Sequence, residues 1–349
     1  MPELRKDPVI GRWVIVATER ARRPGNFVAS NDERFQDTRT QCPYCPPLKD
    51  MICSFRVGGD LKLEKELDPH PKNGKRWDVC VIEFKNSFFS LEEDPKQLDK
   101  GLYEVINGYG SHEVIVETPK HIDNLADLPV EQVQCVLETY ALRIKTLEKN
   151  SFFQHVMAFK NFGATAGSRN IEHARSHIIA TPITPLRVRE KLKSSEEYFE
   201  AKKRCVYCDL MEEELRDKKR IVLENEHFLA ITPFAARFLF EVWILPKKHC
   251  CDFTAGLEGG EADLAQMLKM LLLKFKIGLD DPAYNYIIQT APFRRKTGQI
   301  DSLIDVDFHW HIELMPRLTR VAGFEKGTGF YINSISPEMT AEYLRGVFL

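Results

Sequence analysis

The pattern of apolar and polar positions predicts a long amphipathic helix in each half of this 349-residue chain. In residues 128–149 and again in residues 262–279, apolar side chains return at every third or fourth position, which places them on one side of an α-helix. Pro129 suits an early position in the first of these helices. The apolar positions are Val130, Val133, Leu137, Tyr140, Ile144 and Leu147 in the first helix and Leu264, Leu268, Leu271, Leu272 and Phe275 in the second.

Segments rich in β-branched and aromatic residues predict strands around these helices. Residues 31–75, which contain the first Cys-x-x-Cys pair, are expected to be rich in loops. Strands are predicted over residues 13–17, 79–84, 113–118, 155–162, 172–180, 227–234, 240–245, 284–289 and 307–316, and further helices over 192–205, over 209–219 and from Ser336 onward. The strands 227–234 and 240–245 are expected to pair antiparallel.

The same order of features occurs twice along the chain. A Cys-x-x-Cys pair, a strand ending in Pro-Lys-His or Pro-Lys-Lys-His, a long helix, a strand and a histidine-containing strand occur in residues 1–190 and again in residues 191–349. Matching features in the same order indicate a duplicated unit. We therefore expect an α+β protein of two tandem halves, residues 1–190 and 191–349, each an antiparallel sheet with packed helices.

The repeat predicts a metal site in each half. Nine cysteines, an odd number, do not suggest a disulfide framework in a chain of this size, and two Cys-x-x-Cys pairs suggest metal or redox chemistry. Two thiolates and two imidazoles form a closed tetrahedral set that suits zinc in a structural role. The alternative is that the cysteines are simply buried and a site is empty. The predicted ligand sets are Cys42, Cys45, His121 and His173 for the first site and Cys205, Cys208, His249 and His309 for the second.

Charge and hydropathy narrow the class of protein. The net charge of −2 argues against a general affinity for nucleic acid or anionic membranes. The amino-terminal residues lack the apolar core of a signal peptide, and lysines interrupt the longest apolar stretch, residues 267–279. We expect a cytoplasmic protein.

The strand around residues 172–180 is the main candidate for chemistry. Alternate side chains of a strand share a face, so His173, Arg175 and His177 point the same way. The alternative is a polar strand face with incidental histidines. The small-residue loop 163–170 before it can bring backbone N–H groups close to a phosphate, or it is a plain connection. The arginines of residues 20–23 can hold a phosphate or carboxylate, or form a solvated basic turn.

These motifs resemble the galactose-1-phosphate uridylyltransferase family of the histidine-triad superfamily. The resemblance covers nearly the whole chain, and the two-zinc pattern is nearest to the family's bacterial branch and the related ADP-glucose phosphorylase. It rests on Asp7-Pro8 through Trp13, Arg20-Ala21-Arg22-Arg23-Pro24, Cys42-Pro43-Tyr44-Cys45, His112-Glu113-Val114-Ile115-Val116-Glu117-Thr118-Pro119, the Gly163–Ser168 loop, Phe308-His309-Trp310-His311 and Gly323-Phe324-Glu325.

The resemblance implies two histidine-triad-like halves, a homodimer with an active site drawn from both subunits, and ping-pong nucleotidyl transfer. In that chemistry a histidine attacks the α-phosphate of UDP-glucose, and a second hexose phosphate then takes the nucleotidyl group. It implies nucleotide or phosphate contacts for Arg20, Arg23, Asn86, Phe88, Asn161, Gly167 and Ser168, and a place near the sugar for Phe324 and Glu325.

This chain departs from the family at the nucleophile. The family strand reads His-Pro-His-x-Gln, with the second histidine as nucleophile, whereas this chain has Arg175 there and His177 in place of the glutamine. A guanidinium has no lone pair to offer but can bind phosphate. His177 lies about 7 Å further along the same face.

Three interpretations stay open. The first is a nucleotidyltransferase acting on UDP-hexose or ADP-hexose and hexose-1-phosphate. Its catalytic residues would be His177, as a relocated nucleophile or base, or Arg175, as a stabiliser of phosphoryl charge during direct displacement. The second is a catalytically lapsed family member that binds a nucleotide sugar or a protein partner. A zinc scaffold or nucleic-acid module is disfavoured because the chain has no basic stripe.

Overall fold

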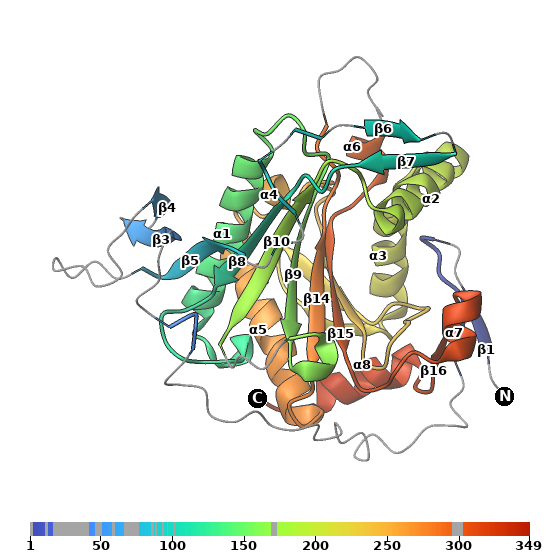
Figure 1. Ribbon diagram of the computed structural model, residues 1–349. Coiled ribbons are helices and arrows are strands. Elements are labelled where there is room, and N and C mark those ends of the chain that lie inside the picture. Colours follow the sequence, from blue (N-terminus) through green and yellow to red (C-terminus); the bar gives the residue numbers. More distant parts are fainter. Residues whose placement is uncertain are drawn as a thin grey trace.

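A single large antiparallel sheet runs through the molecule (Figure 1). Its strand order is β11-β12-β13-β15-β14-β9-β10-β8-β5-β3-β4, and smaller sheets have the orders β1-β2-β16 and β6-β7. The computed structural model describes residues 3–10, 13–16, 42–45, 51–57, 60–65, 77–84, 87, 89–92, 94–95, 97–100, 102–168, 173–294 and 303–349. The observed architecture is therefore the predicted α+β class.

The strands predicted over 155–162 and 284–289 have the predicted bounds, and the other predicted strands differ at one end or both, most of all 227–234 and 307–316. The strands are β1 (Glu3–Lys6), β2 (Trp13–Val16), β3 (Met51–Val57), β4 (Asp60–Lys65), β5 (Val79–Glu83), β6 (Gln97–Lys100), β7 (Tyr103–Ile106), β8 (Ser111–Val116), β9 (His155–Phe162), β10 (Arg175–Thr181), β11 (Ile221–Glu224), β12 (Phe228–Ile231), β13 (Val242–Pro246), β14 (Tyr284–Gln289), β15 (His311–Pro316) and β16 (Tyr331–Asn333). The pairing of β12 with β13 is antiparallel, as predicted.

The predicted repeat is visible in the sheet. In the first half β8, α1 (Val130–Leu147), β9 and β10 follow one another, and in the second half β13, α5 (Glu261–Gly278), β14 and β15 do the same. Each half orders its strands as the other does, and β9 pairs antiparallel with β14 to join the two. One continuous sheet thus carries both halves.

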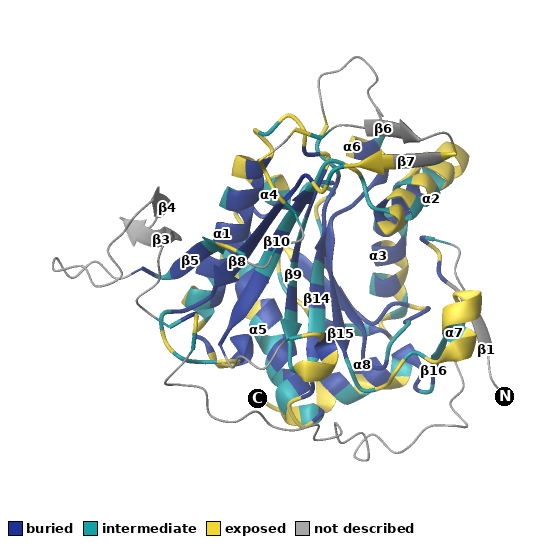
Figure 2. Cartoon of the chain, viewed as in Figure 1, coloured by how far each residue is buried: buried dark blue, intermediate teal, exposed yellow. Residues whose placement is uncertain are grey.

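The helices α1 and α5 lie side by side on one face of this sheet (Figure 1). The apolar residues of both helices belong to the buried core, and the buried parts of α1 and α5 are dark blue in Figure 2. Pro129 precedes α1 with an extended ψ of 154°, so α1 begins one residue after it. The remaining helices are η4 (Leu125–Asp127), η5 (Ala164–Ala166), α2 (Leu186–Lys202), α3 (Val206–Asp217), α4 (Phe253–Gly256), α6 (Ile304–Asp307), α7 (Gly323–Thr328) and α8 (Pro337–Gly346). The N–H of Met339 donates to Ser336 Oγ over 3.2 Å, which is the predicted cap of α8.

Some predicted elements were wrong in place or extent. Residues 51–65, expected to be loop, form the hairpin β3–β4, and the sequence Gly58-Gly59 between these strands is a hairpin signal that the prediction did not use. α2 starts at Leu186 rather than at residue 192. β15 starts at His311 rather than at residue 307, which is the last residue of α6.

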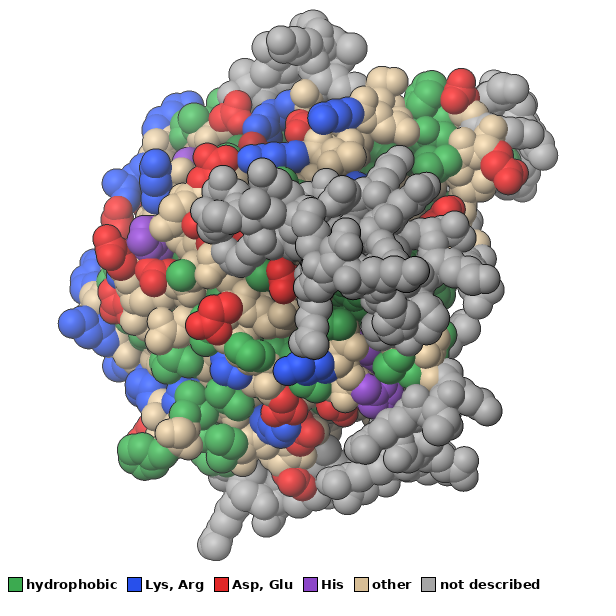
Figure 3. All heavy atoms as spheres, turned by 90° about the vertical axis from the view of Figure 1, so that its left-hand side faces the viewer, with side chains coloured by type: hydrophobic (Ala, Val, Ile, Leu, Met, Phe, Trp, Pro, Cys, Tyr) green, Lys and Arg blue, Asp and Glu red, His purple; other side chains and the backbone are tan. Residues whose placement is uncertain are grey.

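On the face shown in Figure 3, basic and acidic side chains of the described residues are interspersed. No helix in the described part of the chain is long and apolar enough to cross a bilayer.

Candidate active site and metal-binding groups

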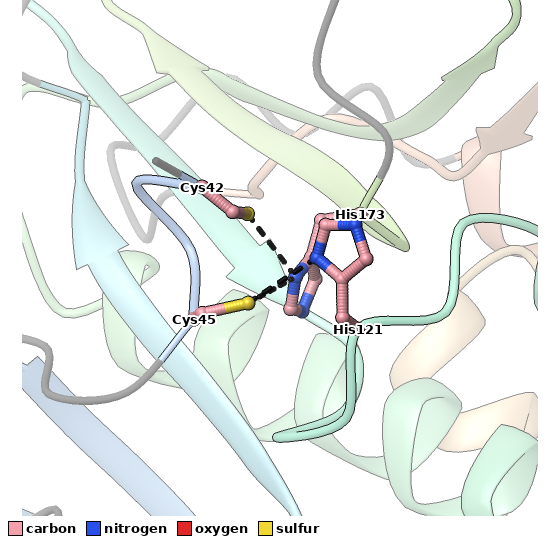
Figure 4. A group of neighbouring side chains, drawn as sticks. All are labelled: Cys42, Cys45, His121 and His173. Atoms are coloured by element: carbon pink, nitrogen blue, oxygen red, sulfur yellow. Dashed lines mark hydrogen bonds between the residues drawn. The ribbon is translucent and has the colours of Figure 1, made fainter. Parts of the chain in front are cut away.

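The first predicted ligand set comes together at the start of β10 (Figure 4). Cys42 and Cys45 lie on one short turn, His121 on the loop after β8, and His173 two residues before β10. The His173 Nδ1 atom lies 3.5 Å from Cys42 Sγ and 3.6 Å from Cys45 Sγ, and His121 Nδ1 lies 3.3 Å from Cys45 Sγ. Two sulfurs and two nitrogens therefore face one common centre.

This geometry fits a tetrahedral metal ion. With Zn–S bonds of about 2.3 Å and Zn–N bonds of about 2.0–2.1 Å at tetrahedral angles, sulfur and nitrogen ligands lie about 3.5 Å apart. The other ring nitrogen of His173 lies 2.9 Å from the Thr118 carbonyl oxygen, to which it donates when Nδ1 binds metal. A partner of this kind fixes the tautomer that a metal-binding histidine needs.

The second ligand set has the same arrangement in the other half. Cys208 Sγ lies 3.4 Å from His249 Nδ1 and 3.6 Å from His309 Nδ1, and Cys205 completes the group. The far nitrogens of the two rings face the carbonyl oxygens of Asp305 and Pro246, at 3.0 and 2.9 Å. A hydrogen bond from Cys205, with those from both histidines, lowers the pKa of Cys208 to about 3, against burial. Both groups can hold a metal ion.

Strand β10 turns different residues towards its two faces, as the alternation predicts. Ala174 and Ile178 are buried in the main apolar core beneath α1 and α5. His173, Arg175 and His177 occupy the opposite face, on which His177 pairs across the sheet with Val114 and Phe159. The polar row is therefore placed by the burial of the other side of the strand.

The guanidinium of Arg175 is held by several groups and is only 6% exposed. It donates to Ser168 Oγ over 2.9 Å and to the His173 carbonyl oxygen over 3.2 Å. Its Cζ lies 5.2 Å from the centre of the Tyr44 ring, which belongs to the Cys42–Cys45 turn. Burial lowers the pKa of Arg175 but leaves it a cation, as arginine is in proteins. Arg175 thus connects the first metal-binding group to the loop before β10.

The imidazole of His177 is fixed on three sides. Its Nδ1 lies 3.1 Å from Nε2 of His112, on β8. Its ring stacks on Phe159 at 5.3 Å and 18° and meets Phe84 edge-on at 6.0 Å. Burial, with His112, Arg175 and Lys160 nearby, lowers its pKa to about 3. His177 is therefore neutral at pH 7 and keeps a nitrogen lone pair, which a nucleophile or base requires.

The loop that precedes β10 is shaped by glycines. Gly163 and Gly167 have φ angles of 79° and 91°, which side chains of other residues rarely adopt. Gly163 also lies against Ala283. A residue with a Cβ in place of Gly163 would bring that atom within 2.6 Å of the Ala283 Cβ. Asn285 of β14 donates to Asn161 Oδ1 over 2.7 Å and to the Ala166 carbonyl over 2.8 Å. The second half of the chain thus holds the loop of the first half.

The corresponding face of the second half is filled by the protein itself. His311 stands two residues after the metal-binding His309, as Arg175 does after His173, and its Nδ1 donates to the His309 carbonyl oxygen over 2.9 Å. Lys191 of α2 lies 3.1 Å from its Nε2, and the Tyr207 ring of α3 lies 5.0 Å from the His311 ring. Burial lowers the pKa of His311 to about 4.

His311 is 0% exposed, so it has no access to a ligand. Helices α2 and α3 cover this face through Lys191 and Tyr207.

Not all predicted site residues can be placed together. Arg20, Arg23, Asn86 and Phe88 lie outside the described residues. Asn161, Gly167 and Ser168 lie in and beside the loop near Arg175.

Phe324 and Glu325 lie on α7, across the sheet from β10 (Figure 1). Glu325 accepts from the backbone N–H groups of Ala322 and Ile332, at 2.8 and 3.2 Å, and Phe324 is 52% exposed. Within one chain these two residues do not meet the β10 row.

The structure adds residues that the sequence analysis did not single out for the site. Besides His112 and Asn285, they include the buried pair of Lys160 and Glu117, which lies on the core side of β10. Lys160 Nζ donates to Glu117 Oε2 over 2.6 Å and to the Arg175 carbonyl oxygen over 2.9 Å. Two of these residues, His112 and Glu117, lie in the segment His112–Pro119 on which the family resemblance rests, and Lys160 stands within a predicted strand.

Comparison with known proteins defines the class of the chain as a nucleotidyltransferase-type enzyme. It belongs to the galactose-1-phosphate uridyl transferase family, because the family's N-terminal domain model matches residues 1–185 and its C-terminal domain model matches residues 191–330.

Individual relatives agree with this assignment. The chain is 34% identical to ADP-glucose phosphorylase of Arabidopsis thaliana, over 100% of this chain and 93% of that protein. It is 30% identical to galactose-1-phosphate uridylyltransferase of Thermotoga maritima, over 99% and 98%. Among solved structures, an Arabidopsis thaliana ADP-glucose phosphorylase with bound ADP-glucose superposes with a TM-score of 0.77 at 32% identity and full coverage of both chains.

Proposed function

We propose that this chain transfers the nucleotidyl group of a nucleotide sugar to phosphate or to a hexose-1-phosphate, with His177 as the nucleophile. The donor is ADP-hexose or UDP-hexose, the two possibilities that the named relatives support. ADP-glucose is the first donor to test, because the relative with 34% identity is an ADP-glucose phosphorylase.

One observation carries the proposal. His177 is a neutral imidazole on the same strand face as the cation Arg175, and its ring orientation is fixed by His112 and Phe159. By resemblance the family nucleophile occupies the position of Arg175, which cannot attack phosphorus because a guanidinium has no lone pair. His177 is the neighbouring group on that face that can.

The chemistry then divides into two displacements. Nε2 of His177 attacks the α-phosphorus, an N–P bond forms, and the bond from phosphorus to the bridging oxygen breaks. Hexose-1-phosphate leaves with that electron pair. In the second step an oxygen of phosphate or of another hexose-1-phosphate attacks the same phosphorus, and the electron pair of the N–P bond returns to Nε2. Arg175, whose guanidinium already bonds Ser168, stabilises the negative charge on the phosphoryl oxygens.

Metal ions and a second subunit complete the proposal. The two Cys2His2 groups hold zinc as closed structural sites, since four protein ligands leave no position for a substrate. Phe324 and Glu325 reach the sugar from the partner of a homodimer, because within one chain they lie across the sheet from β10.

The test is turnover of ADP-glucose and UDP-glucose with phosphate or galactose-1-phosphate as acceptor, followed by phosphorus NMR. Native protein, His177→Ala and Arg175→His are compared, with His227→Ala as a control at an exposed histidine bonded to Asp263. We expect turnover in the native protein and the control, and its loss in His177→Ala. Turnover that survives in His177→Ala would overturn the role of His177.

A second candidate function is nucleotide-sugar binding without transfer. It is favoured by the ties of Arg175 to Ser168 and His173, which make its guanidinium a fixed phosphate contact in the nucleophile's place. Absence of turnover in the native protein, with activity appearing in Arg175→His, would support this reading. Calorimetry with ADP-glucose would then measure the binding directly.

A further inference from the structure

Two histidines from neighbouring strands meet on the site face. We propose that His112 is the positioning residue of His177: its Nε2 accepts a hydrogen bond from His177 Nδ1–H, so that His177 Nε2 is unprotonated and keeps its lone pair for the substrate. The proposal rests on the proposed function of His177 and deepens it by assigning the partner that sets its tautomer. The two nitrogens lie 3.1 Å apart, a hydrogen-bond distance.

His112 and His177 are far apart in the sequence, and the pairing of β8 with β10 brings them together. His112 pairs in register with Ile179 and His177 with Val114, so the two imidazoles are diagonal neighbours on one face of the β8–β10 pair. Phe84 packs against the His112 ring at 4.6 Å, and Phe159 stacks on the His177 ring. Both ring planes are therefore held by aromatic side chains, and neither imidazole can turn away without losing these contacts.

If His177 Nε2 is the nucleophile, the protons on the two rings set the direction of the hydrogen bond. A neutral imidazole carries one N–H and one lone pair. If His112 donated to His177 Nδ1, His177 would carry its proton at Nε2 and have no lone pair left for phosphorus. If His177 Nδ1 donates instead, Nε2 keeps its lone pair. Burial lowers the pKa of His112 to about 4, so its neutral ring can act as the acceptor.

A buried imidazole in the second half is held by a backbone carbonyl. His311 Nδ1 lies 2.9 Å from the His309 carbonyl oxygen, and in the first half the corresponding residue, Arg175, donates to the His173 carbonyl oxygen. His177 stands two residues further along the strand than this position. For the described residues, the contact with His112 is the one hydrogen bond of the His177 ring, so a side chain has the part that a carbonyl has at His311.

The hydrogen bond between His177 and His112 would be stronger during the reaction than in the free enzyme. Formation of the N–P bond leaves a positive charge on the His177 ring while Nδ1 keeps its proton. A hydrogen bond from a charged donor is about twice as strong as a neutral one. His112 would therefore stabilise the nucleotidyl-histidine and the transition state that leads to it, without touching the reacting atoms.

The first test reads the tautomer directly and does not depend on activity. Nitrogen-15 histidine labelling with two-dimensional long-range proton–nitrogen correlation distinguishes an Nδ1–H from an Nε2–H imidazole, and the His177→Ala variant assigns the signal. We expect His177 to be the Nδ1–H tautomer in native protein. An Nε2–H tautomer would overturn the proposal, whether or not the enzyme turns over.

The second test separates positioning from packing. His112→Phe keeps an aromatic ring but removes the acceptor, whereas His112→Gln places an amide oxygen near the position of Nε2. We expect His112→Phe to lower kcat by about 100-fold with KM nearly unchanged, and His112→Gln to restore much of it. Equal kcat in His112→Phe and native protein would overturn the proposal.

The outcomes distinguish this inference from the proposed function. Loss of activity in His177→Ala with full activity in His112→Phe leaves His177 as nucleophile and removes His112. Activity that survives in His177→Ala removes the nucleophile itself. If His112→Phe does not fold, the tautomer in native protein still decides the question.

Discussion

Asn285, in the second half of the chain, donates two side-chain hydrogen bonds to residues of the first half. One goes to Asn161 Oδ1 at 2.7 Å and the other to the Ala166 carbonyl oxygen at 2.8 Å. Both acceptors belong to the segment that leads to the β10 row. The pairing of β14 with β9 brings these residues opposite each other, since Asn285 is in register with Asn161. The joint between the halves is thus also part of the support of the site.

The first prediction follows from this contact. Replacing Asn285 by Ala removes two neutral hydrogen bonds, and we expect the free energy of unfolding to fall by about 2 kcal/mol and kcat/KM for the nucleotide sugar to fall because the loop before β10 loses its support. Asn285→Asp should be worse, because a carboxylate would face two acceptor oxygens. Denaturant unfolding and steady-state kinetics measure both variants. Asn107→Ala, which removes an exposed bond to the Asp94 carbonyl, is the matched control and should retain full activity.

The metal-binding groups give the second prediction. We expect purified protein to contain about two zinc ions per chain by elemental analysis, and Cys42→Ser and Cys205→Ser each to lose one of them and to unfold at a lower temperature. Cys80→Ala is the control, because Cys80 is buried outside both groups. A native protein without zinc, or a Cys42→Ser variant with the full complement, would contradict this assignment.

Acid stability gives the third prediction. His155 is 2% exposed, and its two ring nitrogens have no hydrogen-bond partner among the described residues. Burial lowers its pKa to about 4, so the folded protein keeps it neutral while the unfolded chain takes up a proton below its ordinary value of 6.5. The unfolded state therefore binds more protons between about pH 6.5 and 4, and the free energy of unfolding falls as the pH falls through this window.

Denaturant titrations across that window measure the effect. His155→Gln should reduce the slope of unfolding free energy against pH by up to about 1.4 kcal/mol per pH unit. His227 is the control of opposite sign, because the hydrogen bond to Asp263 raises its pKa. Its contribution is present below pH 6.5 and lost only at higher pH, so His227→Gln should leave the acid slope unchanged. An unchanged slope in His155→Gln would show that this histidine does not titrate on unfolding.

Those parts of the fold with strong local patterns could be predicted from sequence. The leucines of α5 recur at helical spacing and are buried, as predicted. β9 and β14 have the predicted bounds. In each case the pattern of apolar residues within the segment is enough to identify the element. Hairpin β3–β4 was missed although residues 60–65 alternate polar and apolar side chains, and β3 joins the rest of the sheet by pairing with β5, a contact distant in sequence.

The site likewise has features that could be predicted from sequence and features that could not. The two Cys2His2 groups could be predicted because few arrangements suit two thiols and two imidazoles repeated in the same order. The His112–His177 contact could not, because it depends on the register of β8 against β10, and a shift of one residue would put His112 on the other face. Placement of α2 and α3 over His311, which closes the second half, likewise depends on tertiary packing.

The last prediction concerns the charged pair beneath β10. Lys160 and Glu117 are 2.6 Å apart, with side chains 1% and 0% exposed, and Lys160 also holds the Arg175 carbonyl oxygen. Lys160→Met would leave Glu117 buried without its cation, and we expect it to lower the free energy of unfolding by about 3–5 kcal/mol. The double variant Lys160→Met/Glu117→Gln removes both charges and should recover a large part of that loss. Lys145→Met is the control, because its pair with Glu258 is exposed and contributes at most about 1 kcal/mol. Denaturant unfolding of the four proteins measures the pair, and a double variant no more stable than Lys160→Met would mean that the cost comes from the freed carbonyl of Arg175 and not from the unpaired carboxylate.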